Sequence, residues 1–324
     1  MTILFVGSSP DDLGGATQPN TTTNGRDSNY TPVGSVVVGD FDESGDGFTI
    51  SHERSVSTVT WYHFLFNTDQ NTSYSGFADG YWFRIFSGNT EIGRLDVQDN
   101  NWTLQGGGIS STYITPFSTG VDITYDVKVT TNGTTVTLEL YQNSVFVVSV
   151  SYSSSVTAPN AIVFEHFDVV WNSSPRSYHY SEIIVTDNES TLNWRLATLE
   201  PGADGTHTAW LGGFADMITS NDGLGITSNT PAQKESWTLV PYSGPATSSA
   251  VRAVVNKFYA SKGMTGPTQL TPFIRHAAID VEGDTFPITG GKPIVEVLDN
   301  NPQTAAPWNT ADFAALQIGV KSTA

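Results

Sequence analysis

The feature that most constrains the fold is a long alternation of apolar and polar residues on both sides of Asn132-Gly133. Residues 123–131 alternate before this dipeptide, and residues 135–142 alternate after it. Asn-Gly is the pair favoured in the two-residue type I′ turn, and strict alternation gives a strand one apolar face. The pattern predicts an antiparallel hairpin with one face buried against a core.

Similar short runs of β-branched and aromatic residues, separated by Gly, Asn and Asp, fill the chain up to Asp187. They indicate ten or eleven antiparallel strands, which is typical of a sandwich. Because 324 residues exceed what one core usually organises, we expect two domains. The predicted parts are 1–32 (an N-terminal strand and an extended arm or loop), 33–187 (the sandwich) and 188–324 (a smaller β domain).

The second half combines strands with one short terminal helix. Residues 192–199 and 235–242 are predicted strands, and residues 308–322 are predicted to contain the helix, with Asn309 or Thr310 as its cap. An apolar stripe on this segment either seals the domain or docks on a partner. The stripe consists of Trp308, Phe313, Leu316 and Ile318.

Composition excludes several functions. With 32 acidic and 14 basic residues the formal charge is −18, which disfavours nucleic acid and anionic membranes as partners. Since there is no cysteine, the chain has no disulfide, thiolate metal site or cysteine nucleophile. The first residues lack the basic start and long apolar run of a signal peptide, and no segment approaches the length of a membrane helix.

One acidic turn resembles part of a calcium-binding loop. Its candidate ligands, in alternate positions, are Asp40, Asp42, Ser44 and Asp46. The position that should supply a bidentate glutamate is Ser51, and the flanking residues read as strands. We therefore expect an acidic turn and no cofactor, with a weak Ca²⁺ site as the alternative.

No constellation of catalytic residues is evident. Glu165 and Asp168 are the nearest match to the paired carboxylates of glycosidases, but residues three apart on a strand point to opposite faces. There is no nucleophile elbow and no phosphate-binding glycine loop. The prediction is that the protein is not an enzyme.

Some aromatic residues could instead stack on sugars. The candidates lie on neighbouring predicted strands and are Trp61, Tyr62, Tyr81 and Trp82. Adjacent residues of a strand face opposite ways, so at least half of these four must belong to the core.

Several short motifs resemble those of a known class of protein. The hairpin around Asn132-Gly133 is similar to that of concanavalin A-like and laminin-G-like jelly rolls. The closing strand 181–185, the turn 201–210 and the terminal stretch 301–320 resemble tailed-bacteriophage virion proteins, in which such a jelly roll precedes a smaller β domain. Asn309 stands where a Thr is usual after the Trp of the terminal stretch.

The resemblance implies a non-enzymatic virion structural protein, either a capsid decoration or head fibre, or a tail or baseplate subunit. Its partners would be other virion proteins and its own copies, in a homo-oligomer such as a trimer. It would be made in the host cytoplasm and displayed on the virion surface. The alternatives are a carbohydrate-binding, lectin-like tail fibre that recognises a cell-surface glycan and, ranked lower, a glycan hydrolase.

Overall fold

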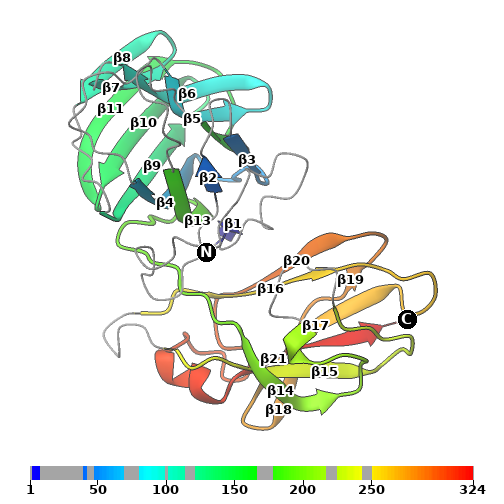
Figure 1. The fold of residues 1–324 in the computed structure, drawn as a ribbon. Helices are drawn as coiled ribbons and strands as arrows, with labels where there is room; N and C mark the ends of the chain where they lie inside the picture. The colour runs from blue at the N-terminus through cyan, green and yellow to red at the C-terminus, as the bar shows by residue number, and fades with distance from the viewer. Residues whose placement is uncertain are drawn as a thin grey trace, which may run out of the picture. The chain divides into compact units, whose positions relative to one another are not determined.

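In the computed structural model the chain divides into two compact units, Met1–Leu196 and Ala197–Ala324, which we describe separately. Both consist almost entirely of antiparallel strands (Figure 1). The structure describes residues 2–7, 39–41, 47–68, 80–98, 101–113, 121–165, 178–216, 225–242 and 250–323. The predicted arm, residues 10–32, lies outside these ranges.

The N-terminal unit is a sandwich of two sheets. A seven-stranded sheet has the order β1-β13-β4-β9-β10-β11, with β2 also pairing with β13. Its strands are β1 (Thr2–Gly7), β2 (Gly39–Phe41), β4 (Val59–Thr68), β9 (Ile123–Thr131), β10 (Thr135–Gln142), β11 (Val145–Ser153) and β13 (Tyr178–Asp187). The six-stranded sheet has the order β3-β12-β5-β6-β7-β8. Its strands are β3 (Gly47–Ser51), β5 (Gly80–Ser87), β6 (Thr90–Gln98), β7 (Asn101–Gly106), β8 (Ile109–Tyr113) and β12 (Ala161–Glu165).

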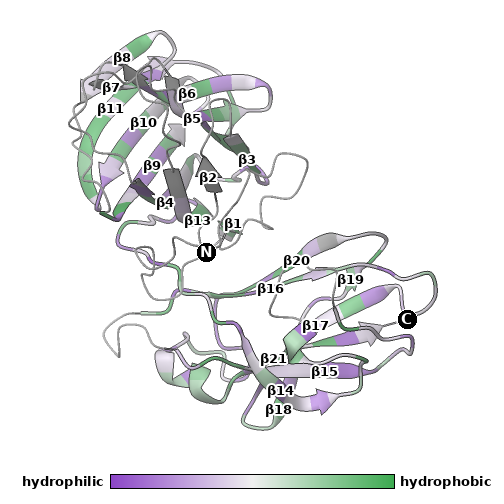
Figure 2. Ribbon diagram, in the orientation of Figure 1, coloured by the Kyte–Doolittle hydropathy of each residue, from purple (hydrophilic) through white to green (hydrophobic). Residues whose placement is uncertain are grey.

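The predicted hairpin is present as β9 and β10, and Gly133 in its turn has a φ of 86°, a left-handed conformation that glycine adopts without a steric penalty. Figure 2 shows the alternating hydropathy along β10. The inward side chains of both sheets form one core, in which Phe64 packs edge-on against Trp82 with ring centroids 5.5 Å apart. The prediction of an all-β jelly-roll sandwich is confirmed.

The C-terminal unit is a smaller sandwich-like arrangement. Its main sheet has the order β14-β15-β21-β17-β18, with β19 beside β17, and β16 and β20 form a separate two-stranded ribbon. The strands are β14 (Pro201–Thr208), β15 (Lys234–Leu239), β16 (Val254–Ala260), β17 (Gln269–His276), β18 (Ile279–Glu282), β19 (Phe286–Pro287), β20 (Lys292–Leu298) and β21 (Gln317–Thr323). One core cluster joins Trp237 and Val320 of the sheet to Ile294 of the ribbon.

The terminal segment differs in part from the expected helix. A short 3₁₀ helix, η4 (Thr310–Ala315), begins at the cap Asn309, whose side chain accepts a hydrogen bond from the Ala311 N–H. The chain then enters β21, so Ile318 lies on a strand and not on a helix. β21 pairs with β15 on one side and with β17 on the other. The hydrogen bonds of these two ladders outweigh the weak helix propensity of the segment.

The segment after β13 also differs from the prediction. Residues 192–199 form no strand, and the boundary between the units falls after Leu196 instead of after Asp187. The buried Thr191 donates to the Asp126 carboxylate at 2.6 Å, and the Arg195 side chain donates to Glu182. These contacts attach residues up to Leu196 to the N-terminal sandwich, which is why the boundary falls there.

Candidate functional site

Only Tyr81 among the four predicted stacking residues has an accessible ring. Tyr62 and Trp82 belong to the core, and Trp61, on the opposite face of β4 from Tyr62, is 6% exposed. Tyr81 is 38% exposed on the outer face of the six-stranded sheet. The rule that adjacent strand residues face opposite ways therefore separates Tyr81 from Trp82 as expected.

A β-bulge sets the direction of these side chains. The register of β5 against β6 shifts between Tyr81 and Phe83, so that Trp82 and Phe83 both reach the core. Bulges insert an extra residue and turn the following side chain to a new direction. As a result Tyr81 and Arg84 lie on the same outer face, three positions apart.

Charged side chains surround Tyr81 and hold it. The guanidinium carbons of Arg84 and Arg94 lie 5.4 Å and 5.0 Å from the centre of its ring, within the range of cation–π attraction. Further side chains from β6, β7 and β12 complete the surface. We call this the Tyr81 face: Tyr81, Arg84, Glu91, Arg94, Asp96, Gln105 and Glu165.

The two arginines would repel each other without the acids between them, because Arg84 pairs directly opposite Arg94 in the β5–β6 ladder. Arg84 contacts Glu165, and Glu91 lies 3.1 Å from Arg94. Arg94 also lies 2.9 Å from Asp96 and donates to the Gln105 side-chain oxygen at 2.9 Å. The surface is thus held in place by contacts between strands.

The charges on this face nearly cancel. Burial raises the pKa of Asp96, and the neighbouring Arg94 offsets this only in part. Burial lowers the pKa of Arg94, but the charges of Asp96 and Glu91 more than compensate, so the net shift is upward and the side chain stays charged. Two cations beside three carboxylates give a surface with many donors and acceptors and little net field, which suits hydroxyl groups better than ions.

The other predicted site residues are not brought together. Asp42, Ser44 and Asp46 lie outside the described residues, as does Asp168, and of Asp40 only the backbone in β2 is described. In the described part of the chain, no group of three or more His, Asp or Glu side chains could hold a metal ion. Glu165 is engaged by Arg84.

The apolar stripe of the terminal segment is largely internal. Trp308 and Leu316 are buried in a cluster with Ile274, and Phe313 packs against this cluster. Ile318 packs on the neighbouring cluster around Trp237. In this structure the stripe lines the core of the C-terminal unit, which is the first of the two roles considered for it.

Sequence reasoning missed the charged partners of Tyr81. Arg84 and Arg94 are two of only 14 basic residues in the chain, and both fall in one short hairpin. Two basic residues in one hairpin of so acidic a chain could have indicated a charged surface there. Which acid each arginine meets depends on the bulge and the strand order, and no spacing in the sequence reports these.

Fold and site together define an all-β protein with a sandwich unit that carries a polar outer face around one exposed tyrosine. No helix in the described ranges is long and apolar enough to cross a membrane. No known protein family matches the chain, and neither does any curated protein.

Solved structures with a similar fold include a botulinum neurotoxin serotype D binding domain (13% identity, 47% of this chain and 39% of that one, TM-score 0.35). Another is a sialidase (14% identity, 50% of this chain and 17% of that one, TM-score 0.31). A third is a botulinum neurotoxin type C structure from work on its interaction with two ganglioside molecules (12% identity, 53% of this chain and 46% of that one, TM-score 0.34). The chain spans less than half of each, and the likeness concerns the β-sandwich fold alone.

Proposed function

We propose that this protein is a non-enzymatic, lectin-like binding protein, and that the Tyr81 face takes a neutral carbohydrate. The observation that carries the proposal is the exposed Tyr81 ring with the guanidinium groups of Arg84 and Arg94 close beside it. An aromatic ring offers its apolar face to the C–H groups of a sugar, and the ring of charged and amide groups offers hydrogen bonds to its hydroxyls.

The near-zero net charge of the face supports a neutral ligand over an ionic one. Arg94 and Asp96 are both partly exposed and fixed by their mutual contact at 2.9 Å, so little side-chain entropy is lost on binding. An open sheet face buries little ligand surface, so we expect affinities on the order of 1 mM for a single sugar.

A glycan array probed with the full chain tests the proposal, followed by titration of the best neutral oligosaccharide. Tyr81→Ala should weaken binding about tenfold, which corresponds to about 1.4 kcal/mol, whereas Tyr81→Phe should keep most of the affinity. Phe146→Ala is the matched control, because Phe146 is an exposed aromatic residue on the other sheet of the same unit. Absence of any bound glycan, or equal loss in the Phe146 control, would reject the site.

Catalysis is tested separately. Incubation of the bound oligosaccharide with the protein should release no new reducing ends. Turnover that depends on Glu165 would show that the face is an active site and would reinstate the hydrolase alternative.

A second candidate function is the structural role in a phage particle. The outer face of the β16–β20 ribbon supports it, because Tyr259, Val295 and Val297 are exposed there on neighbouring strand positions. Exposed apolar patches on a ribbon are typical of contact surfaces. Light scattering should then show multimers that Tyr259→Glu dissociates, and protein gels of purified particles should contain the chain. A monomer absent from particles would exclude this role.

A further inference from the structure

A second aromatic ring adjoins the Tyr81 face, five residues along β5 from Tyr81. This residue, Phe86, has buried neighbours on both sides, Ile85 and Ser87, so its own side chain points outward. The Phe86 side chain is partly exposed. Its partner on β12 is Ala161, whose side chain is too small to cover the ring. The outer face of the sheet thus offers two aromatic rings to a ligand.

Arg84 lies between the two rings. Its guanidinium carbon is 5.4 Å from the centre of the Tyr81 ring and 5.4 Å from the centre of the Phe86 ring. Both distances are within the range of cation–π attraction. The two ring centres are therefore no farther apart than twice this distance, and a ligand that contacts both rings passes close to the guanidinium.

Each ring also has a carboxylate opposite it in the β5–β6 ladder. The opposed pairs are Tyr81 with Asp96 and Phe86 with Glu91. The combination of an apolar ring and a hydrogen-bond acceptor therefore occurs twice, once on each side of Arg84. A repeated arrangement of this kind suits a ligand that is itself built of repeated units.

Glu91 keeps some of its acceptor capacity for a ligand. Its carboxylate lies 3.1 Å from Arg94 and 3.7 Å from Arg84, and its side chain is 29% exposed. An ionised carboxylate offers about four lone-pair positions, so the two arginines do not occupy all of them. A sugar hydroxyl next to the Phe86 ring can donate to the positions that remain.

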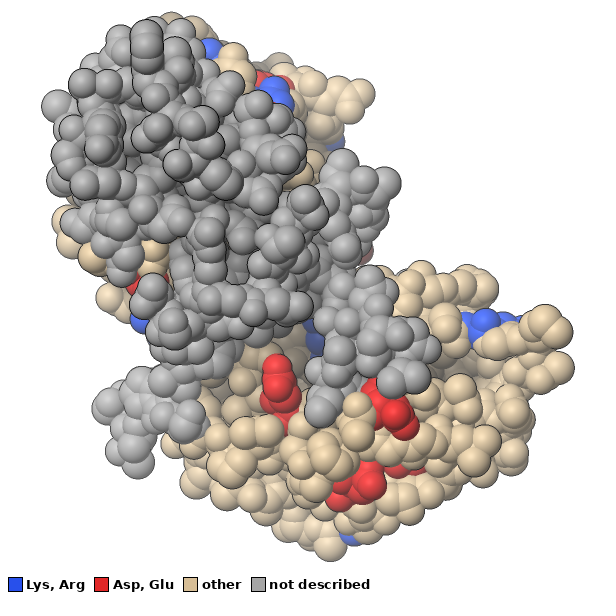
Figure 3. Space-filling model, in the orientation of Figure 1, with Lys and Arg blue, Asp and Glu red and all other residues tan. Residues whose placement is uncertain are grey.

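The balance of charge on this face contrasts with the rest of the chain. The sequence has 32 acidic and 14 basic residues, and Figure 3 shows separate acidic patches on the visible surface of the C-terminal unit. Around Tyr81, in contrast, each carboxylate lies against an arginine: Glu165 against Arg84, and Glu91 and Asp96 against Arg94. An uncharged chain of sugars meets no strong field along such a surface.

We propose that the Tyr81 face binds an extended neutral glycan of at least two sugar units, with one unit on Tyr81, another on Phe86, and Arg84 donating to hydroxyls between them. This inference rests on the proposed function and adds Phe86 as a second point of contact. Once the first unit of a chain is bound, the second binds with little further loss of translational freedom. The protein should therefore prefer a chain to a single sugar.

Calorimetric titration of the full chain tests this preference. The probes are the neutral oligosaccharide that binds best on the glycan array and its own monosaccharide and disaccharide fragments. We expect the oligosaccharide to bind about tenfold more tightly than the monosaccharide, with the disaccharide between them.

Variants at Phe86 show where this gain arises. Phe86→Ala should remove the gain with length and leave the monosaccharide affinity unchanged, because the single sugar occupies the more exposed Tyr81 ring. Phe86→Tyr retains an aromatic ring and should retain the gain. Phe146→Ala, on the other sheet, should have no effect, and thermal unfolding shows whether each variant is folded.

The outcomes separate this inference from the proposed function. Binding that depends on Tyr81 but not on chain length would overturn the inference and leave the Tyr81 site in place. A gain with length that survives Phe86→Ala, or one that Phe86→Tyr abolishes as fully as Phe86→Ala does, would also overturn it. Absence of binding to every glycan would reject the proposed function, and this inference with it.

Discussion

Replacing Arg195 with alanine should destabilise the N-terminal sandwich, even though the side chain is half exposed. Glu182 lies on β13 with no exposed surface, in a left-handed backbone conformation with a φ of 53°. Its carboxylate accepts from Arg195 Nε at 2.8 Å, from Arg195 Nη2 at 2.7 Å and from the Leu196 N–H at 3.1 Å. Without the guanidinium, a buried carboxylate keeps one backbone donor.

The expected magnitude lies between two limits. Removing one partner of a buried pair costs about 3–5 kcal/mol, whereas exposed pairs contribute less than about 1 kcal/mol. Because the Arg195 side chain is 51% exposed, water can replace part of its contact with Glu182. We therefore expect Arg195→Ala to lower the free energy of unfolding by about 2 kcal/mol.

Urea unfolding of the full chain, monitored through hydrogen exchange of the amides in β4 and β13, measures this loss of stability in the N-terminal unit. The variants Arg195→Ala, Glu182→Gln and the double variant form a cycle, in which a direct contact gives a coupling above about 1 kcal/mol. Arg252→Ala serves as the control for loss of an exposed arginine. A loss below about 0.5 kcal/mol for Arg195→Ala, or simple additivity in the cycle, would refute the reasoning.

Three further predictions concern the same contacts and the C-terminal unit. Trypsin should spare the bond after Arg195 in the folded chain and cut it in Glu182→Gln, because the contact with β13 holds this segment; equal cutting on gels would contradict this. Gly319→Ala should cost about 1–3 kcal/mol in thermal unfolding, since the added Cβ would lie 2.3 Å from a ring carbon of Phe273. Asp280→Asn should cost about 2 kcal/mol at pH 7, because the folded-state pKa is lowered from 3.8 to about 2. That contribution is present above the unfolded pKa and disappears as pH falls to about 2, so a penalty that persisted in acid would exclude the charge as its cause.

The sandwich was predictable because its evidence is local. Alternation along residues 123–131 and 135–142 specifies which side chains enter the core, and Asn132-Gly133 specifies the turn between them. The segment 192–199 was mispredicted as a strand because its apolar residues suggest a sheet position, whereas Arg195 binds the buried Glu182 of β13 in the same unit. Local pattern cannot show which surface a segment will contact.

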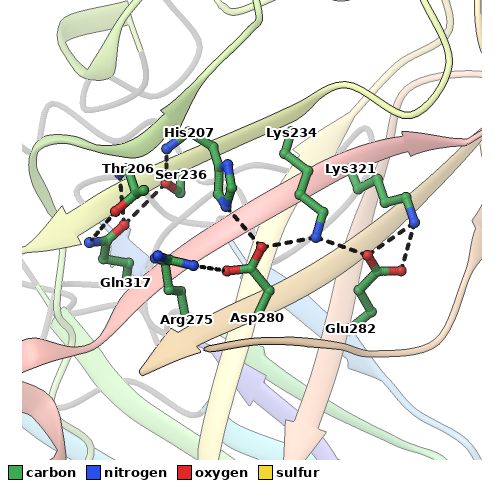
Figure 4. A network of polar contacts seen from close by, with 9 residues as sticks. All are labelled: Thr206, His207, Lys234, Ser236, Arg275, Asp280, Glu282, Gln317 and Lys321. Atoms are coloured by element: carbon green, nitrogen blue, oxygen red, sulfur yellow. Dashed lines mark hydrogen bonds and ion pairs between the residues drawn. The ribbon is translucent and has the colours of Figure 1, made fainter. Parts of the chain in front are cut away.

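The same limit explains why the sequence indicates one charged cluster and gives no sign of the other. The Tyr81 face draws most of its charges from a single hairpin, so the pairing of β5 with β6 brings close in space residues that are also close in sequence. A second network, in the C-terminal unit, joins His207, Lys234 and Asp280 from three strands (Figure 4), and Lys234 reaches Asp280 across the intervening β21 and β17. Their meeting depends on a strand order in which the last strand of the chain inserts between two earlier ones. Insertion of β21 therefore creates the sheet on which this network is built, and the spacing of these residues in the sequence does not reveal it.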